Sequence, residues 1–364
     1  MKRKATVALL TVAMMTALTA CGGAKETPAT TAAPTAPEQA QAEVTSESKE
    51  GKAQEANAAS GTVMLYSSMQ EDQLVAIKEG FEKKYPGIKM DYYFAGTGKV
   101  ITKIATEHQS GQVAADVIWV GDPSDYIGFK KEGILAKYSS PEASTIDSKF
   151  IDPDGYYTGA RMMNMAIGYN TSLVSEEEVP KSWNDLLDPK WSNQIVMTDP
   201  SSAGTTKYFV GAMLSNQNYG EEYFKRLKEN GCELESGTTA THNQVAAGAY
   251  KVGVMLDYVT QNLIDEGSPL GFKYLDSDLV SIFSPIGLVE GCANEENGKL
   301  LYDFILSKEG QEILVENNLL SIRNDVEQKG ASVEEIARAA MDVDLQSLAD
   351  KSDEIINTFD GIFK

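Results

Sequence analysis

The stretch Asp199-Pro-Ser-Ser-Ala-Gly-Thr-Thr206 combines hydroxyl and glycine residues at the point where a helix with an apolar face begins. The first turn of a helix has unpaired backbone N–H groups and the positive end of the helix dipole, so it attracts anions. The residues expected to contact such an anion are Ser201, Ser202, Ala203, Gly204 and Thr205. The spacing is not that of a Walker phosphate-binding loop. A well-capped helix start without a ligand is the other interpretation.

Hydroxyl, glycine and acidic residues follow three apolar segments near the start of the folded region. Each segment reads as a strand of a parallel sheet, and in such sheets ligands bind beyond the carboxyl ends of the strands. Each of these residues taken singly could be an ordinary helix cap or turn residue. Three such loops at the same edge of one sheet favour a binding site. The residues that follow the segments are Ser67 and Ser68, then Thr97 and Gly98, then Asp122.

A fourth apolar segment, 251–256, is expected to be a strand that brings Asp257 and Tyr258 to its carboxyl edge. It follows a helical pattern over 240–250 that contains His242. A carboxylate and a phenol at a strand end can bind a cation, a hydroxyl group or a metal ion. The pair therefore joins the list of candidate site residues.

The elements that must position these residues alternate between strand and helix. Apolar residues at three- and four-residue spacing predict helices after the strands at 62–66, 88–94 and 116–120. A second run of the same kind extends from about 164 to 282. The alternation predicts an α/β protein in which each of two lobes is a mostly parallel sheet flanked by helices.

The N-terminal region contains the segments of a bacterial export signal in their usual order. Lys2, Arg3 and Lys4 precede an apolar stretch that is too short to span a membrane comfortably, and Leu18-Thr19-Ala20-Cys21-Gly22 resembles a lipobox. We expect a signal peptide over 1–20, lipidation of Cys21, and a disordered tether to residue 60, because that segment has few large apolar residues.

Composition excludes several classes of protein and names no function. The chain has 53 acidic and 32 basic residues, a formal net charge of −21, which argues against a nucleic-acid partner. Three cysteines and two histidines are too few for a disulfide scaffold or a zinc-finger array.

The ordered set of segments resembles the extracellular solute-binding lipoproteins of bacterial ABC importers. The similar branch includes ferric-ion, phosphonate and sugar-phosphate binders. The resemblance covers 61 to about 325 and rests on the lipobox, Tyr66-Ser67-Ser68, Asp116-Val-Ile-Trp119, Ile167-Gly-Tyr-Asn170, Pro180-Lys-Ser-Trp183, Asp199-Pro-Ser-Ser-Ala-Gly204, Ala247-Gly-Ala-Tyr-Lys-Val-Gly253, Ser284-Pro-Ile-Gly-Leu288 and Phe304-Ile-Leu-Ser-Lys-Glu-Gly-Gln311.

The resemblance implies a type II periplasmic-binding-protein fold with the ligand cleft between two lobes. Lobe 1 would comprise 61–163 and a return segment 284–331, lobe 2 would comprise 164–283, and helices over 332–364 would pack across both. A ligand that contacts both lobes would stabilise a closed form, which a membrane permease recognises.

The resemblance also suggests the ligand class, a small anion bearing a phosphate, phosphonate or carboxylate. Arg161, near the implied hinge, would pair with the anion or form a salt bridge between lobes. Asp257 would bind a cationic or hydroxyl part of the ligand, Tyr258 would stack or donate, and His242 would be a polar contact. Ferric iron is the alternative ligand, held by Asp257 and Tyr258, although relatives that bind iron usually have adjacent tyrosines there.

Other functions are less well supported by the sequence. A secreted enzyme would need a nucleophile or metal motif, and none of the common motifs is present in the sequence. An adhesin or scaffold would not need the hydroxyl-rich loops. We therefore expect a non-enzymatic protein without a cofactor, monomeric, outside the cytoplasmic membrane, and attached to it only through the lipid on Cys21.

Overall fold

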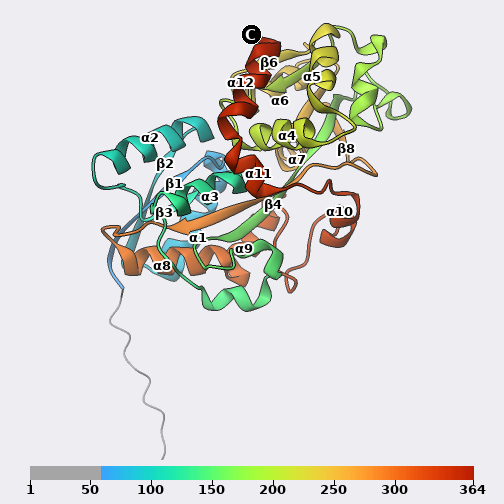
Figure 1. Cartoon of the computed structure of the whole chain (residues 1–364). Coiled ribbons are helices and arrows are strands. Elements are labelled where there is room, and N and C mark those ends of the chain that lie inside the picture. Colours follow the sequence, from blue (N-terminus) through green and yellow to red (C-terminus); the bar gives the residue numbers. More distant parts are fainter. Residues whose placement is uncertain (1–58) are drawn as a thin grey trace, which may run out of the picture. The chain divides into compact units, whose positions relative to one another are not determined.

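A computed structural model describes residues 59–364, and its central feature is a nine-stranded mixed sheet (Figure 1). The signal peptide, Cys21 and nearly all of the expected tether lie outside the described residues. The strands are β1 (Gly61–Ser67), β2 (Ile88–Phe94), β3 (Val117–Trp119), β4 (Thr158–Asn170), β5 (Ile195–Thr198), β6 (Glu233–Glu235), β7 (Val252–Leu256), β8 (Leu270–Lys273) and β9 (Ser281–Leu288). Their order is β2-β1-β3-β9-β4-β7-β5-β6, with β8 also paired to β4.

The helices alternate with the strands as the apolar spacing predicts. Leu74, Ile77 and Phe81, which define the first helical pattern, are fully buried in α1. The helices are α1 (Glu71–Lys84), α2 (Thr97–Gln109), α3 (Pro123–Lys131), α4 (Gly204–Ser215), α5 (Gly220–Glu229), α6 (Thr238–Ala246), α7 (Asp257–Asp265), α8 (Glu295–Leu306), α9 (Lys308–Glu316), α10 (Val333–Ala339), α11 (Leu345–Asp350) and α12 (Ser352–Phe363).

Strand β4 belongs to both halves of the sheet. Its first part, from Thr158 to Asn164, pairs antiparallel with β9, and its second part pairs antiparallel with β7 and β8. Parallel pairing occurs on either side of it, between β1 and both β2 and β3, and between β5 and both β6 and β7. We call β1–β3, β9, α1–α3, α8 and α9 lobe 1, and β5–β8 with α4–α7 lobe 2.

The pairing of β4 with β9 is interrupted by one extra residue. Gly159 pairs with Pro285 and Arg161 pairs with Ser284, so Ala160 has no partner in β9 and forms a β-bulge. A bulge bends the strand and changes the direction of the neighbouring side chains.

The C-terminal helices contact both lobes. Helix α11 packs against α3 of lobe 1 and also against α4 of lobe 2, while α12 packs against α4 and α5 (Figure 1). Trp183 and Trp191, in the segment between β4 and β5, are both buried. The two cysteines of the described region, Cys232 and Cys292, are both buried and unpaired.

Candidate functional site

A cleft of about 1070 Å³ is lined by residues of both lobes. Lobe 1 contributes the loops that follow β1, β2 and β3, and lobe 2 contributes the loops that follow β5, β6 and β7. The cleft therefore lies at the carboxyl ends of the parallel strands, where α/β sheets bind ligands.

Three helices begin at the wall of this cleft. The first residues of α2, α4 and α6, which are Thr97, Gly204 and Thr238, all line it. No side chain caps the backbone N–H groups at the start of any of these three helices. Unpaired N–H groups and three positive dipole ends favour a negatively charged ligand.

Glycines allow the two lobes to touch beside the cleft. A Cβ atom on Gly98 would lie 2.4 Å from the carbonyl oxygen of Ser201, and one on Gly96 would lie 2.7 Å from that of Ser202. Likewise, a Cβ on Gly204 would lie 2.9 Å from Cγ2 of Thr97. The backbone of α2 therefore packs directly on the loop before α4, which is a closed arrangement of the lobes.

Arg161 is the buried cation of the cleft. Its exposed fraction is 1%, and it lines the cleft from β4, the strand shared by the two lobes. Its guanidinium carbon lies 5.3 Å from the ring centre of Trp119 and 5.8 Å from that of Tyr258. One terminal nitrogen is 3.4 Å from Oε1 of Gln73.

No carboxylate within residues 59–364 forms a salt bridge with Arg161, and its Nε has no hydrogen-bond acceptor there. Burial lowers the pKa of Arg161, with opposing effects from Tyr258 and Tyr126. A buried charge without a counter-ion is costly, because removal from water is not offset by an opposite charge. An anion in the cleft would remove that cost.

A second charged group lies where the lobes meet, and sequence analysis did not predict it. Lys207 on α4 pairs with Asp122 and Asp125 at the start of α3, with Nζ 3.0 Å from Oδ2 of Asp122. Its Nζ is also 3.3 Å from the hydroxyl of Ser352 on α12. Lys207 and Asp125 line the cleft. Acidic residues in the first turn of a helix suggest capping, so only the fold reveals this contact between lobes.

Most of the site residues that the sequence suggested line this cleft. They are Ser68, Thr97, Gly98, Arg161, Ser201, Ser202, Ala203, Gly204, Thr205 and Tyr258. The cleft wall also includes residues that sequence reasoning missed, at the start of α6 (Thr238, Thr239) and in the C-terminal helices (Ser352, Asp353, Ile356).

Two of the lobe 1 candidates do not line the cleft and have structural contacts instead. The Ser67 hydroxyl is fully buried, donates to the carbonyl of Trp119 at 2.8 Å and accepts the Met69 N–H at 3.0 Å. Asp122 accepts the Ser124 N–H at 2.8 Å as the N-cap of α3 and pairs with Lys207. The geometry therefore gives no support to the prediction that these two residues contact a ligand.

His242 is likewise a core residue and not a cleft residue. Its Nδ1 lies 2.7 Å from the carbonyl of Thr238, and its Nε2 accepts the Leu256 N–H at 3.1 Å. Burial lowers the pKa of His242 to about 4, so the ring is neutral and joins α6 to β7. This geometry gives no support to the prediction that His242 contacts a ligand.

Asp257, for which the sequence predicts a contact with the ligand or iron, is held by hydrogen bonds within the protein. Its carboxylate is buried, does not line the cleft, and accepts four hydrogen bonds. The donors are the N–H and the side-chain amide of Asn164, at 3.1 and 2.7 Å, the N–H of Tyr258 at 2.8 Å and the hydroxyl of Tyr274 at 2.9 Å. These contacts join β4 to the start of α7.

The described residues offer no ready metal centre and no membrane span. No three side chains from histidine, cysteine, aspartate and glutamate gather closely enough within residues 59–364 to hold a metal ion. In the same part of the chain, no helix has the length and apolar character needed to cross a bilayer.

Comparison with known proteins matches this fold and cleft to one family. Residues 115–344 match the family described as bacterial extracellular solute-binding proteins. The chain belongs to this family. The family's placement of the protein outside the cytoplasm agrees with the export signal expected from the sequence.

Individual relatives of this solute-binding protein are similar over most of their length. A periplasmic protein of Salmonella typhimurium named for 2-aminoethylphosphonate binding is 29% identical over 262 residues, 67% of this chain and 72% of that protein. An Fe(3+)-binding periplasmic protein of Serratia marcescens is 23% identical, over 73% of this chain and 79% of that protein.

A solved structure adds a third comparison. The periplasmic binding protein AfuA of Actinobacillus pleuropneumoniae, with fructose-6-phosphate bound, is 26% identical and superposes with a TM-score of 0.75. The match covers 84% of this chain and 99% of AfuA. The two-lobed α/β fold expected from the sequence is confirmed.

Proposed function

We propose that this solute-binding protein captures a small organic anion, bearing a phosphate, phosphonate or carboxylate group, and delivers it to the permease of an ABC importer. The observation that carries the proposal is Arg161, a buried cation of the cleft without a carboxylate partner among residues 59–364. The anion would neutralise Arg161 and accept hydrogen bonds from the helix starts around it.

The anion donors would come from both lobes. Ser68, Thr97 and Gly98 would contact the ligand from lobe 1, and 201–205 would contact it from lobe 2. A ligand held by both sides stabilises the closed arrangement by the difference between its affinities for the closed and open forms. Strand β4 joins the lobes and contributes Arg161, so the lobes would open and close about this strand. No bond is broken, and the protein acts without catalysis.

Two of the comparisons support a phosphorus-containing ligand. One relative is named for a phosphonate, and AfuA holds a sugar phosphate. Both ligands combine a phosphorus oxyanion with an organic part. A cleft of about 1070 Å³ is far larger than an inorganic anion needs, which supports an organic ligand.

Ferric iron is the second candidate, favoured by the Serratia relative and by Tyr258 in the cleft wall. Its support is weaker, because Asp257 does not line the cleft and is hydrogen-bonded to Asn164. Burial also raises the pKa of Tyr258, with Arg161 opposing the shift, and this disfavours the phenolate that iron would bind.

We further propose that the protein is a monomer held outside the cytoplasmic membrane by lipid on Cys21. The sequence order of basic segment, apolar segment and lipobox supports the anchor. Metabolic labelling with a palmitate analogue tests it directly. Loss of the label in Cys21→Ser is expected, and retention of the label would contradict lipidation at this residue.

A thermal-unfolding panel tests the ligand class. The purified chain would be heated with 2-aminoethylphosphonate, fructose-6-phosphate, inorganic phosphate and ferric citrate in turn. A ligand at 100 times its dissociation constant stabilises by about 2.7 kcal/mol, which gives a clear rise in melting temperature. A rise with a phosphorus compound is expected. A rise with ferric citrate alone, together with a visible phenolate absorption, would favour the iron candidate.

A further inference from the structure

The bulge at Ala160 is held by a buried side chain that does not line the cleft. Gln311 of α9 is fully buried, and its Nε2 donates to the carbonyl of Ala160 at 2.6 Å and to that of Ile305 at 2.9 Å. Because Ala160 has no partner in β9, its carbonyl would be unsatisfied without Gln311.

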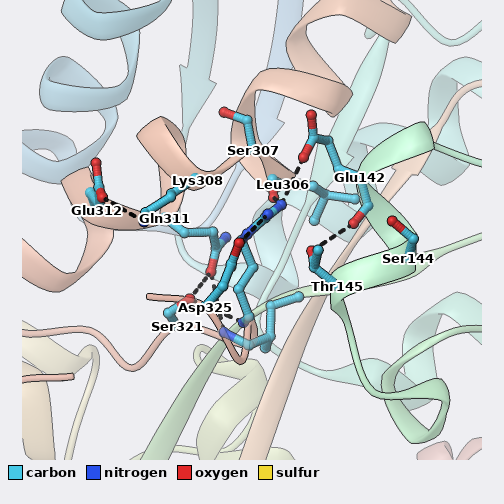
Figure 2. A network of polar contacts seen from close by, with 12 residues as sticks. Glu142, Ser144, Thr145, Leu306, Ser307, Lys308, Gln311, Glu312, Ser321 and Asp325 are labelled. Carbon is cyan, nitrogen blue, oxygen red and sulfur yellow. Dashed lines mark hydrogen bonds and ion pairs between the residues drawn. The ribbon is translucent and has the colours of Figure 1, made fainter. Parts of the chain in front are cut away.

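The other end of the Gln311 amide is fixed just as firmly. Its Oε1 accepts the hydroxyl of Ser321 at 2.8 Å (Figure 2). The same atom accepts the N–H of Ile322 at 3.2 Å. All the hydrogen-bonding positions of this amide are therefore occupied. The side chain acts as a rigid brace between α9, the segment 319–323 and β4.

The segment 319–323 is itself held in place by the ion pairs of Arg323. Arg323 has an exposed side-chain fraction of 5% and pairs with Asp325 at 2.8 Å and with Glu142 at 2.7 Å. Its guanidinium also donates to the carbonyl of Leu306 at 2.9 Å. A buried guanidinium with all of these partners holds the backbone around it in one geometry.

Arg161 lies between two residues, Ala160 and Met162, whose backbone groups are held by hydrogen bonds. The carbonyl of Ala160 is held by Gln311, and the N–H of Met162 donates to the carbonyl of Leu320 at 2.9 Å. The side chain between them extends to Trp119 and Tyr258 in the cleft. A change of direction at the bulge would move the guanidinium away from both rings.

We propose that Gln311 is a positioning residue that holds the Ala160 bulge and so aims Arg161 into the ligand cleft. The consequence for ligand binding rests on the proposed role of Arg161 as the counter-ion of the anion. Gln311 does not line the cleft, so it would act on the ligand only through Arg161.

The direct test observes Arg161 without any ligand. The chain has five arginines, so the Nε–H signals in a ¹⁵N–¹H spectrum can be assigned, that of Arg161 by its absence in Arg161→Lys. Ring currents from Trp119 and Tyr258 shift this signal away from those of exposed arginines. We expect Gln311→Met to move it toward the position of an exposed arginine.

Two further variants separate positioning from general stability. Gln311→Glu keeps the acceptor for Ser321 and Ile322 but loses both donors, so it should move the signal as Gln311→Met does. Ser321→Ala is the matched control, since it weakens the same network without touching Ala160. It should lower the melting temperature and leave the Arg161 signal in place. An unmoved signal in folded Gln311→Met or Gln311→Glu overturns the proposal.

A double-mutant cycle then tests whether Gln311 affects ligand binding through Arg161, with 2-aminoethylphosphonate as the probe. If Gln311 acts through Arg161, Gln311→Met weakens binding at least tenfold alone and adds nothing in an Arg161→Met background. Additive losses would overturn the role in binding. Because the spectrum needs no ligand, a shifted signal without any binding of the probe would count against the proposed ligand class and not against the brace.

Discussion

Lys207 of α4 and Asp122 of α3 form an ion pair between the two lobes, with Nζ 3.0 Å from Oδ2. The exposed fractions of their side chains are 11% and 1%, so the pair is shielded from solvent. Asp125 shares the same ammonium group, and Ser352 of α12 contacts it as well. The contact thus joins both lobes and the C-terminal helices at one point beside the cleft.

This ion pair should stabilise the closed form. Removing one partner of a buried pair costs about 3–5 kcal/mol, and opening the cleft avoids that cost by hydrating the two carboxylates. We expect Lys207→Met to shift the protein toward an open form and to weaken ligand affinity by at least about tenfold. Small-angle X-ray scattering and calorimetry measure the two effects.

The matched control is Lys225→Met, because Lys225 pairs with Glu221 on an exposed surface of α5. Exposed pairs contribute about 0–1 kcal/mol, so scattering and affinity should stay as in the wild type. An unchanged scattering curve and affinity in Lys207→Met would show that the pair does not affect closure.

The glycines of α2 give a second prediction about closure. In Gly98→Ala the new Cβ would lie 2.4 Å from the Ser201 carbonyl, a distance that forces the lobes apart. Overpacking costs about 1–3 kcal/mol, which corresponds to a loss of affinity of about 5- to 150-fold. The melting temperature without ligand should change little, since alanine favours a helix.

Gly128→Ala in α3 provides the control for this substitution, because nothing lies within 4 Å of its new Cβ. It should leave the affinity unchanged. Equal affinities in the two alanine variants would mean that the ligand-bound form does not bring α2 against the Ser201 loop.

Asp125 gives a pH dependence with a defined sign. Burial raises its pKa to about 7, Lys207 opposes the rise and Asp122 adds to it. The ordinary pKa of an aspartate is about 3.9, so the folded protein holds a proton that the unfolded chain has released. The resulting stability is complete below about pH 4 and is lost as the pH rises through about 7.

Urea unfolding of the wild type and of Asp125→Asn between pH 4 and pH 8 measures this effect. The difference in unfolding free energy should change across that window, because the asparagine does not titrate. A difference that is constant with pH would contradict the raised pKa of Asp125. The comparison cancels the contributions of the other acidic groups.

Asp257 should prove to be a residue of the fold and not of ligand binding. Asp257→Ala leaves the Asn164 amide and the Tyr274 hydroxyl without their acceptor. An unsatisfied buried group costs about 1–3 kcal/mol, so the free energy of unfolding should fall by at least that amount. Asp276→Ala, at an exposed position, is the control for loss of a carboxylate.

The order of preference among ligands should be the same in Asp257→Ala as in the wild type. A specific loss of binding for aminated or hydroxylated ligands would restore the role that the sequence suggested for Asp257.

The sequence predicted the elements and their order because apolar spacing reports burial directly. The strand at 88–94 and the buried face of α1 follow from that spacing alone. Arg161 was also a candidate, from its place near the implied crossing between lobes. That Arg161 is buried without a carboxylate partner among residues 59–364 was not predictable, because pairing depends on which side chains the other elements bring to it.

The candidates that proved structural share one cause. Ser67 and Ser68 are neighbours, as are Asp257 and Tyr258, and in each pair one residue lines the cleft while the other faces the interior. Position at a strand end predicts the edge of the sheet, but the direction of one side chain depends on the last dihedral angles of the strand. Polar type alone does not distinguish a ligand contact from a buried hydrogen bond.

Contacts between distant segments were beyond the sequence for a different reason. Lys207 meets Asp122 only because the lobes close, and Ser352 reaches the cleft only because α12 packs on α4. The bulge at Ala160 arises from its pairing with β9, which is more than a hundred residues away. The spacing of apolar residues along one segment does not report which distant segments that segment will contact.

Titration calorimetry of the purified chain and of Arg161→Met tests the central claim most directly. The titrants are 2-aminoethylphosphonate, fructose-6-phosphate and ferric citrate. We expect a phosphorus anion to bind the wild type and to lose at least about 30-fold in affinity in Arg161→Met, because truncating a buried, charged partner costs about 2 kcal/mol or more. Undiminished binding of these anions by Arg161→Met, or binding of iron alone, would contradict a cleft built around an anion and Arg161.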